Sequence, residues 1–370
     1  MDRMKKKLGF GCMRLPMIDG KVDMAAFREM VDAFLAQGFN YFDTAHGYLD
    51  GQSEVALREC LTSRYPRDAY VLTNKLSNHH FTKNEGIRPL FESQLQICGV
   101  DYFDFYLMHA QSKSSFEKYK QCRAYETALE LLAEGHIRHF GISFHDKANV
   151  LDQILTEYPQ IEVVQIQLNY LDFDDPAVES RKCLEVCRKH GKPAIVMEPV
   201  KGGSLVNLPE EAQKILDDLG GGSNASYAIR FAASQEGVMM VLSGMGDMQM
   251  VSDNCGYMKD FKPLDEKETE AVAKVCEVFQ GLGAIPCTAC RYCTEVCPQG
   301  IAIPTMFAWL NKKRLFNWNA ADYYNRYIED GRKAKDCLHC GACEGICPQH
   351  LPIRELLETI SQAFDNEESI

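Results

Sequence analysis

Short apolar runs alternate with amphipathic stretches through the first 280 residues of the chain. Each run has the length of a buried strand, and each following stretch repeats its apolar positions at the period of a helix. The runs are residues 9–12, 40–44, 70–75, 103–109, 139–143, 163–169, 194–198 and 239–243. The predicted helices are residues 25–37, 53–62, 86–98, 124–133, 149–156, 177–190, 225–233 and 248–258. This α/β pattern favours a (β/α)8 TIM barrel over an open doubly wound sheet, and no GxGxxG follows a strand.

Polar residues stand at or near the carboxyl ends of three successive runs, which is where a barrel of this kind carries its chemistry. Asp43, with Tyr48 five residues on, is followed by Lys75 and then by His109. Singly, Asp43 would serve as a helix cap, Tyr48 as a rim aromatic and His109 as a core histidine. Together they indicate a proton-transfer site, in which the Lys75 ammonium is expected to lower the pKa of Tyr48. Residues 17–23 predict a small extra hairpin around Asp19-Gly20.

Eight of the sixteen cysteines form two copies of one pattern. Each copy reads C-x2-C-x2-C-x3-C-P, and the second lies 50 residues after the first at every position. This is the spacing of two-cluster bacterial ferredoxins, in which the fourth cysteine of each copy binds the other cluster. It assigns one [4Fe–4S] cluster to Cys287, Cys290, Cys293 and Cys347, and the other to Cys337, Cys340, Cys343 and Cys297.

Zinc sites and disulfides are the alternatives for these cysteines. Zinc would take two C-x-x-C pairs and leave the third cysteines and the prolines unexplained, while disulfides do not suit a cytosolic chain. The residues between the two copies, 301–335, carry apolar and aromatic side chains near helical spacing, which is typical of an α-helical ferredoxin-like domain. The other eight cysteines are interpreted as small buried hydrophobic residues of a reducing cell.

Composition adds limits on partners and on compartment. The chain is 46% hydrophobic and 25% charged, as in soluble globular proteins. A net charge of −12 argues against nucleic acid as the main partner, and no apolar run is long enough for a membrane span. We therefore expect a cytoplasmic protein with a barrel at residues 1–262, a connecting helix at 263–283 and a cluster domain at 284–370. The helix would begin with a capping box between Asp265 and Glu268.

At the polar strand ends the chain resembles the aldo-keto reductase family, over roughly residues 7–257. The likeness is carried by Gly9-Phe10-Gly11-Cys12-Met13-Arg14, Phe42-Asp43-Thr44-Ala45 with Tyr48, Ser53-Glu54, Thr73-Asn74-Lys75, Leu107-Met108-His109, Gly141-Ile142-Ser143 and Val164-Gln165. With its cysteine-rich tail, the chain is similar to an iron–sulfur subgroup of that family. The resemblance implies a nicotinamide-dependent carbonyl or alcohol oxidoreductase with an Asp-Tyr-Lys-His tetrad.

On that resemblance, Tyr48 protonates the carbonyl oxygen, Lys75 tunes it, Asp43 braces Lys75 and His109 positions the substrate. The nicotinamide carboxamide would be held by Ser143 and Gln165, and the pyrophosphate by the loop from Glu198 to Ser204. The full set of implied cofactor-binding residues is Met13, Arg14, Ser143, Gln165, Glu198, Pro199, Lys201, Gly202, Ser204, Ser243, Gly244, Met245, Gln249 and Asn254.

Several positions depart from the family pattern. Phe144 stands where Asn is usual, and Met197 where many members stack an aromatic ring on the nicotinamide. Gly244 and Met250 stand where NADP-selective members carry Lys and Arg, and Asp247 adds a negative charge nearby. Because a phosphate next to Asp247 is repelled, we expect NAD(H) to be preferred over NADP(H), or both to bind weakly, with Lys201 or Arg14 as alternative cations.

A hydride carries two electrons and a [4Fe–4S] cluster accepts one, so direct exchange between them normally needs a flavin. Three functions therefore stay open. In the first, the clusters serve structure or sensing in a working reductase. In the second, they connect the barrel to a redox protein partner or to the substrate. In the third, the protein is an electron-transfer or regulatory subunit whose barrel no longer turns over nicotinamide. The substrate in the first two is a small carbonyl or alcohol.

Overall fold

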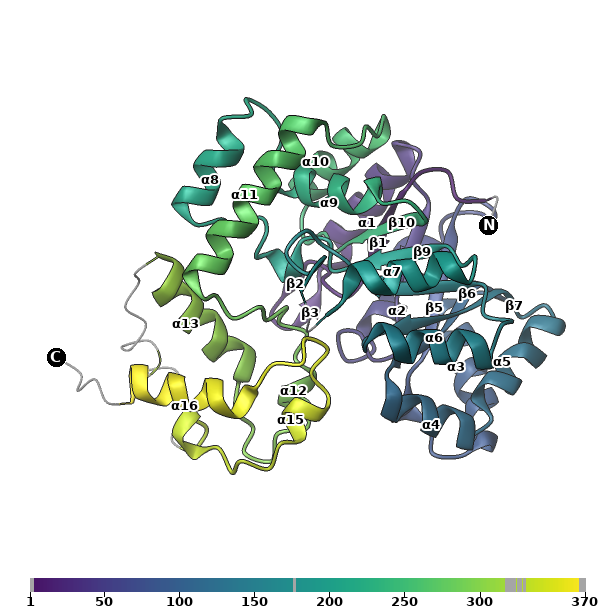
Figure 1. Cartoon of the computed structure of the whole chain (residues 1–370). Helices are drawn as coiled ribbons and strands as arrows, with labels where there is room; N and C mark the ends of the chain where they lie inside the picture. The colour runs from purple at the N-terminus through teal and green to yellow at the C-terminus, as the bar shows by residue number, and fades with distance from the viewer. Residues whose placement is uncertain (1–2, 176–177, 317–323, 325–327, 329–330, 366–370) are drawn as a thin grey trace. The chain divides into compact units, whose positions relative to one another are not determined.

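A computed structural model describes residues 3–175, 178–316, 324, 328 and 331–365 of the chain (Figure 1). The chain forms two compact units. The first consists of residues 1–175, 179–199 and 228–264, and the second mainly of Val200–Tyr227 and Asp265–Ile370. The segment between the seventh barrel strand and its helix thus belongs to the second unit, which no sequence pattern predicted.

The first unit is a closed barrel of eight parallel strands, as the alternation of runs predicted. The strand order around the barrel is β1-β10-β9-β8-β7-β6-β5-β4, and β4 pairs with β1 to close it. The strands are β1 Leu8–Gly11, β4 Tyr41–Asp43, β5 Val71–Leu76, β6 Phe103–Gln111, β7 Ile137–Phe144, β8 Val163–Gln167, β9 Ala194–Met197 and β10 Val238–Ser243. The predicted hairpin is also present, as the antiparallel pair β2 Met17–Ile18 and β3 Lys21–Val22.

Helices follow the strands in turn. They are α1 Met24–Ala36, α2 Gln52–Leu57, α3 Ile87–Cys98, α5 Ala124–Ala133, α6 Ala148–Glu157, α7 Ser180–Lys189, α9 Asn224–Ser234 and α10 Met248–Lys259. Asp23 caps α1 and Asp247 caps α10 through their carboxylates, which satisfies backbone N–H groups at each helix start. The predicted start of the helix at residues 177–190 lies partly outside the described residues.

Two helices and one irregular turn were not predicted. After β6, α4 Lys113–Gln121 precedes α5; its sequence is polar and buries only Ser115, Phe116 and Tyr119. Helix α8, Glu210–Asp217, lies between β9 and α9. Helix α2 continues as the π-helical turn η1 Arg58–Thr62, and the remaining short helices are η2 Asn78–His80, η3 Asn84–Gly86, η4 Lys201–Gly203 and η5 Ala334–Asp336.

The core of the barrel consists of side chains that the strands point inward. Tyr41, Phe105, Ile195 and Met240 are each almost completely buried in one cluster. Packing on both faces of the strands explains why the runs read as continuous apolar segments rather than as alternating ones. The result is a filled barrel whose polar strand ends lie at one rim.

The second unit is helical, as predicted for the cluster domain. It contains α8, α11 Glu266–Leu282, α12 Tyr292–Glu295, α13 Ile303–Phe316, α15 Ala342–Gly345 and α16 Ile353–Phe364. Asp265 and Glu268 form the expected capping box of α11, which ends at Gly283 in the left-handed region. Of the aromatic residues predicted as linker helix, Trp318, Tyr323 and Tyr327 lie outside the described residues.

The sequence duplication is a structural duplication. Helices α12 and α15 begin 50 residues apart, as do α13 and α16. The left-handed backbone positions repeat too: Ala289 with His339, Arg291 with Gly341 and Gly300 with His350. Buried core residues repeat at the same spacing, such as Cys293 with Cys343 and Ile303 with Ile353. Each copy therefore folds into the same cysteine loop followed by a helix.

Within the described residues, no helix is both long and apolar enough to span a membrane.

Candidate active site and cluster sites

The sheet register brings the predicted catalytic residues to neighbouring strands. Asp43 ends β4, Lys75 lies on β5 next to it, and His109 lies on β6. Tyr48 follows β4 in the loop before α2. Because the carboxyl ends of parallel strands meet at one end of a barrel, these four side chains converge there.

The Lys75 ammonium is the centre of this group. Its Nζ donates to Asp43 Oδ1 at 2.5 Å, to the Thr44 carbonyl at 2.8 Å and to Tyr48 Oη at 3.3 Å. Lys75 is fully buried and Asp43 almost so. A buried ammonium needs a charged partner and further acceptors to offset its desolvation, and Asp43 with Thr44 supplies them. The second Asp43 oxygen accepts from Gln165 Nε2 at 3.1 Å.

The pKa of Tyr48 shifts in the direction opposite to the one expected from the sequence. Burial raises the pKa of Tyr48 well above its ordinary value, and the Asp43 carboxylate raises it further. Burial likewise lowers the pKa of Lys75 and raises that of Asp43, and each partner's charge opposes the shift of the other. The expected lowering of the Tyr48 pKa by Lys75 is not found, because burial of the phenol and the Asp43 carboxylate both raise it. Tyr48 therefore holds its proton at neutral pH.

His109 lies edge-on to Tyr48, with ring centroids 5.8 Å apart. Its Nδ1 is 2.6 Å from Ser77 Oγ. Burial lowers the pKa of His109 well below its ordinary value, and the Lys75 ammonium lowers it further. His109 is therefore a neutral imidazole. Ser77 was not predicted, although it stands two residues after Lys75 and so on the same face of the extended chain.

The predicted nicotinamide-contacting residues lie at the ends of several strands. Ser143 Oγ, on β7, accepts from the Ala110 amide at 2.8 Å. Arg14, after β1, is 3.5 Å from Glu198, after β9. Ser243 Oγ accepts from Asn254 Nδ2 at 2.9 Å, which connects β10 to α10. Others in the first unit are Met13, Gln165, Pro199, Gly244, Met245 and Gln249.

Lys201, Gly202 and Ser204 belong instead to the second unit. Lys201 is 2% exposed, and its Nζ donates to Gln349 Oε1 at 3.3 Å. Gly202 has a positive φ of 63°, and a Cβ built on it would stand 2.5 Å from the Thr288 carbonyl oxygen. The contacts of this turn with described residues thus include neighbours of Cys287 and Cys347. Its predicted contact with pyrophosphate stays a prediction.

The first predicted cluster set is drawn together in the second unit. Burial raises the pKa of the Cys293 thiol to about 12, and Cys290, Cys287 and Cys347 each raise it further by their charge. The Ala289 amide donates to Cys287 Sγ at 3.4 Å. Gln349 Nε2 is a buried donor with no hydrogen-bond partner among the described residues, two positions after Cys347. A donor set of four sulfurs with an orphaned N–H nearby suits a sulfide-containing cluster.

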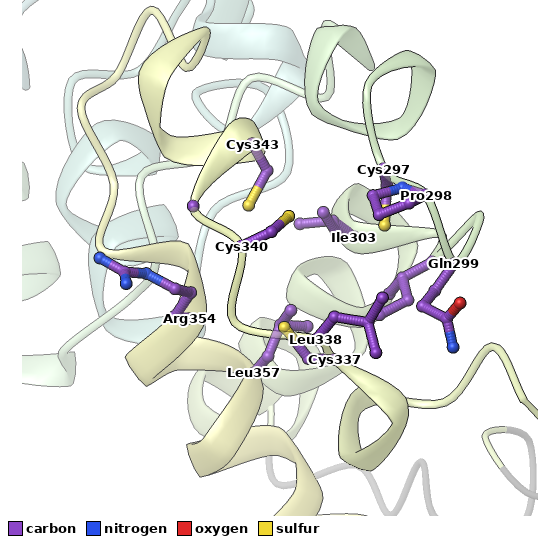
Figure 2. A pocket seen from close by; sticks show the side chains of 12 residues that line it. Cys297, Pro298, Gln299, Ile303, Cys337, Leu338, Cys340, Cys343, Arg354 and Leu357 are labelled. Atoms are coloured by element: carbon purple, nitrogen blue, oxygen red, sulfur yellow. The ribbon is translucent and has the colours of Figure 1, made fainter.

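The second set lines one small pocket. Cys297, Cys337, Cys340 and Cys343 surround it together with Ile303, Leu338, Arg354 and Leu357, and Figure 2 shows the four cysteines around one space. The His339 amide donates to Cys337 Sγ at 3.4 Å, which repeats the first set. Among the described residues, no group of three or more His, Cys, Asp or Glu side chains is arranged to hold a single metal ion.

Comparison with family models gives two matches. The aldo/keto reductase family matches residues 7–277, and a 4Fe-4S dicluster domain matches residues 286–351. Together the two matches span nearly the whole of the described chain.

Curated relatives match parts of the chain. The NADH-specific methylglyoxal reductase of Escherichia coli is 30% identical over 185 residues, which is 45% of this chain and 54% of that protein. The match thus spans about half the length of that relative. An uncharacterized oxidoreductase of Bacillus subtilis is 23% identical over 299 residues, 72% of this chain and 91% of its own length.

Solved structures share the barrel. An aldo-keto reductase from Bacillus halodurans in its holo form superposes with a TM-score of 0.58 at 24% identity, covering 74% of this chain and 96% of that one. An aldo-keto reductase from Klebsiella pneumoniae in complex with NADPH gives 0.57 at 19% identity, covering 73% and 95%. At such identities the likeness establishes the fold.

Proposed function

Because this chain belongs to the aldo/keto reductase family and carries a ferredoxin-type 4Fe-4S domain, we propose that it is a nicotinamide-dependent oxidoreductase of small carbonyls or alcohols. Asp43, Tyr48, Lys75 and His109 are its catalytic group, and two [4Fe–4S] clusters bind in the second unit. The observation that carries the proposal is that one buried ammonium, Lys75, contacts both Asp43 and Tyr48.

When bound, the nicotinamide supplies or accepts a hydride, and each cluster supplies or accepts one electron. Tyr48 is the proton donor to the carbonyl oxygen, because its raised pKa keeps the phenol protonated until negative charge develops on the substrate. Lys75 then stabilises the tyrosinate across the 3.3 Å contact. Asp43 holds the ammonium in place for that role.

His109 orients the carbonyl. In the tautomer that this role requires, the neutral imidazole accepts from Ser77 Oγ at Nδ1 and carries its proton on Nε2. That N–H donates to the carbonyl oxygen from the side opposite Ser77. The residue acts as a hydrogen-bond donor and leaves proton transfer to Tyr48.

The cofactor lies across the strand ends in this proposal. Ser143 and Gln165 hold the carboxamide, and Arg14 leaves its ion pair with Glu198 to meet the pyrophosphate. The adenosine end meets Ser243, Gly244, Met245, Gln249 and Asn254. Met250 and Gly244 offer no cation to a 2′-phosphate, and Asp247 repels one, so NAD(H) is preferred.

The clusters follow the crossed assignment. One takes Cys287, Cys290, Cys293 and Cys347, and the other takes Cys297, Cys337, Cys340 and Cys343, supported by the electrostatic coupling and the pocket lining described above. By sequence the domains are proposed as 1–262, 263–283 and 284–370, while residues 200–227 pack with the second unit. No disulfide joins any two of the described cysteines, which suits a reducing compartment such as the cytoplasm. A redox protein is the proposed partner of the clusters.

The test is Tyr48→Phe in the reconstituted protein, assayed anaerobically with NADH and a panel of small aldehydes and ketones. Loss of the proton donor lowers kcat by about 10²–10⁴-fold, while NADH binding, followed by fluorescence, is unchanged. Retained carbonyl turnover in Tyr48→Phe would overturn the assignment. Bleaching of the cluster absorbance by NADH alone would show that electrons pass between the two kinds of cofactor.

A further inference from the structure

The two cysteine sites have the same sequence pattern, but the residues next to the cysteines are buried to different extents. At the first site Thr288 is 3% exposed and Gln349 is 2% exposed. At the second site the residue equivalent to Thr288 is Leu338, which is 60% exposed, and the residue equivalent to Gln349 is Gln299, which is half-buried. The difference arises where the turn Lys201–Gly203 covers the first site.

That turn brings the Lys201 ammonium against Gln349, two residues after Cys347 of the first set. Lys201 Nζ donates to the amide oxygen of Gln349, Oε1, which leaves the amide nitrogen, Nε2, as a donor for another group. Nε2 is buried without a hydrogen-bond partner among the described residues, two residues after Cys347. Gly202 holds the turn against Thr288, next to Cys287, because only a residue without Cβ approaches that carbonyl so closely.

We propose that the Lys201–Gln349 pair raises the reduction potential of the cluster bound by Cys287, Cys290, Cys293 and Cys347 above that of its duplicate. This inference rests on the proposed clusters. The potential of such a cluster depends on net charge, on hydrogen bonds to its sulfurs and on exposure to solvent. A buried ammonium and a buried amide N–H both favour the more negatively charged, reduced state. Burial strengthens both effects.

The second site has a cation of a different kind. Arg354 lines that pocket, but its side chain is 45% exposed and is paired with Glu344 at 2.8 Å. Solvent and the carboxylate together screen its charge. The cluster of the Cys287 set would therefore be reduced first, and the cluster of the Cys337 set, at lower potential, would be reduced after it.

The experiment is an anaerobic redox titration of the reconstituted full-length protein, followed by electron paramagnetic resonance. Wild-type protein tests the proposed clusters, because it must contain about eight irons and show two reduction waves. Lys201→Met tests the inference: the higher-potential wave falls and the lower one stays. Lys201→Arg keeps the charge and keeps the wild-type potential. Arg354→Met, the matched control, moves the higher wave by less than Lys201→Met does.

Two unchanged waves in Lys201→Met, or an equal fall of both, would overturn the inference without touching the cluster assignment. Loss of iron from Lys201→Met with full iron in Lys201→Arg would support it, since the charge is then needed to hold that cluster. Loss of iron from both variants would indicate a packing role and would also overturn it. A wild-type protein that binds no iron would instead refute the proposed function.

Discussion

Lys75 Nζ lies 2.5 Å from Asp43 Oδ1, with the ammonium fully buried and the carboxylate almost so. The pair connects two neighbouring strands, β4 and β5, at the rim of the barrel. Each charge is out of water, so each depends on the other for its solvation. The same ammonium contacts Tyr48 Oη, so the Asp43–Lys75 pair also holds in place the cation next to the proposed proton donor.

Asp43→Asn is expected to lower both stability and turnover. It leaves the Lys75 ammonium buried without its carboxylate, which costs about 3–5 kcal/mol of unfolding free energy. Urea denaturation of the wild type and the variant measures this loss. Adding Lys75→Met to Asp43→Asn is the control, because removing both charges restores part of the stability while turnover stays low. If the loss of unfolding free energy in the double variant equalled the sum of the losses in Asp43→Asn and in Lys75→Met alone, the two residues would not be coupled.

The fold was predictable from the sequence, and the residues proposed as catalytic could be selected from it, because both signals are local. Eight apolar runs fix the number of strands, and Asp43, Lys75 and His109 are simply the polar residues at three of their ends. The cysteine spacing points to the proposed cluster ligands because the chemistry of a two-cluster domain favours that spacing. Each of these inferences needs only neighbours along the chain.

What was not predictable depends on tertiary context. No local pattern shows that Lys201 is buried against Gln349, 148 residues away. The direction of the Tyr48 pKa shift could not be predicted, because it depends on how deeply the phenol is buried and on the nearby Asp43 carboxylate, both of which raise the pKa. Helix α4 was not predicted because its sequence is mostly polar, with Phe116 and Tyr119 as its only large buried side chains.

The lowered pKa of His109 predicts that the free energy of unfolding depends on pH. Its pKa in the folded protein lies well below the value of about 6.5 in the unfolded chain. Between these two values the unfolded state binds one more proton, so stability falls as pH falls, by about 1.4 kcal/mol per pH unit. The groups that face His109 and lower its pKa after burial are Lys75, His145, His79 and His80.

The measurement is the free energy of unfolding of wild type and His109→Gln between pH 7 and pH 5. Glutamine does not titrate, so the variant lacks this part of the slope, and the other groups cancel in the comparison. Parallel curves for the two proteins would show that His109 is protonated as easily in the folded state as in the unfolded one.

Met250→Arg is expected to shift cofactor preference toward NADPH. Met250 is 47% exposed on α10, at the position where the resemblance to NADP-selective family members implies an arginine. A charge-assisted contact with the 2′-phosphate is worth about 1.4 kcal/mol or more, so the ratio of NADPH to NADH affinity rises by about tenfold. Met248→Arg, on the same helix, adds the same charge as a control. An equal shift in both variants would indicate long-range attraction rather than a contact.

Gly202→Ala is expected to loosen the turn over the first cluster site. The new Cβ meets the Thr288 carbonyl at 2.5 Å, and the backbone there is left-handed. Strain and overpacking together cost roughly 2 kcal/mol or more. Hydrogen exchange of the amides at residues 199–205 and 286–292 measures the effect and is faster in the variant. Gly221→Ala, in the same segment but with open space around it, leaves exchange unchanged.

The crossed cluster assignment makes a prediction that a simple sequential assignment reverses. Cys347→Ala removes a ligand of the set Cys287, Cys290 and Cys293, although it lies 50 residues beyond Cys297. We therefore expect Cys347→Ala to abolish the higher-potential wave and Cys297→Ala to abolish the lower one, each with a loss of about four irons. Cys276→Ala, outside both motifs, keeps both waves. If the fourth cysteine of each copy served its own cluster, Cys297→Ala would instead remove the wave of the Cys287, Cys290 and Cys293 set, and Cys347→Ala would remove that of the Cys337, Cys340 and Cys343 set.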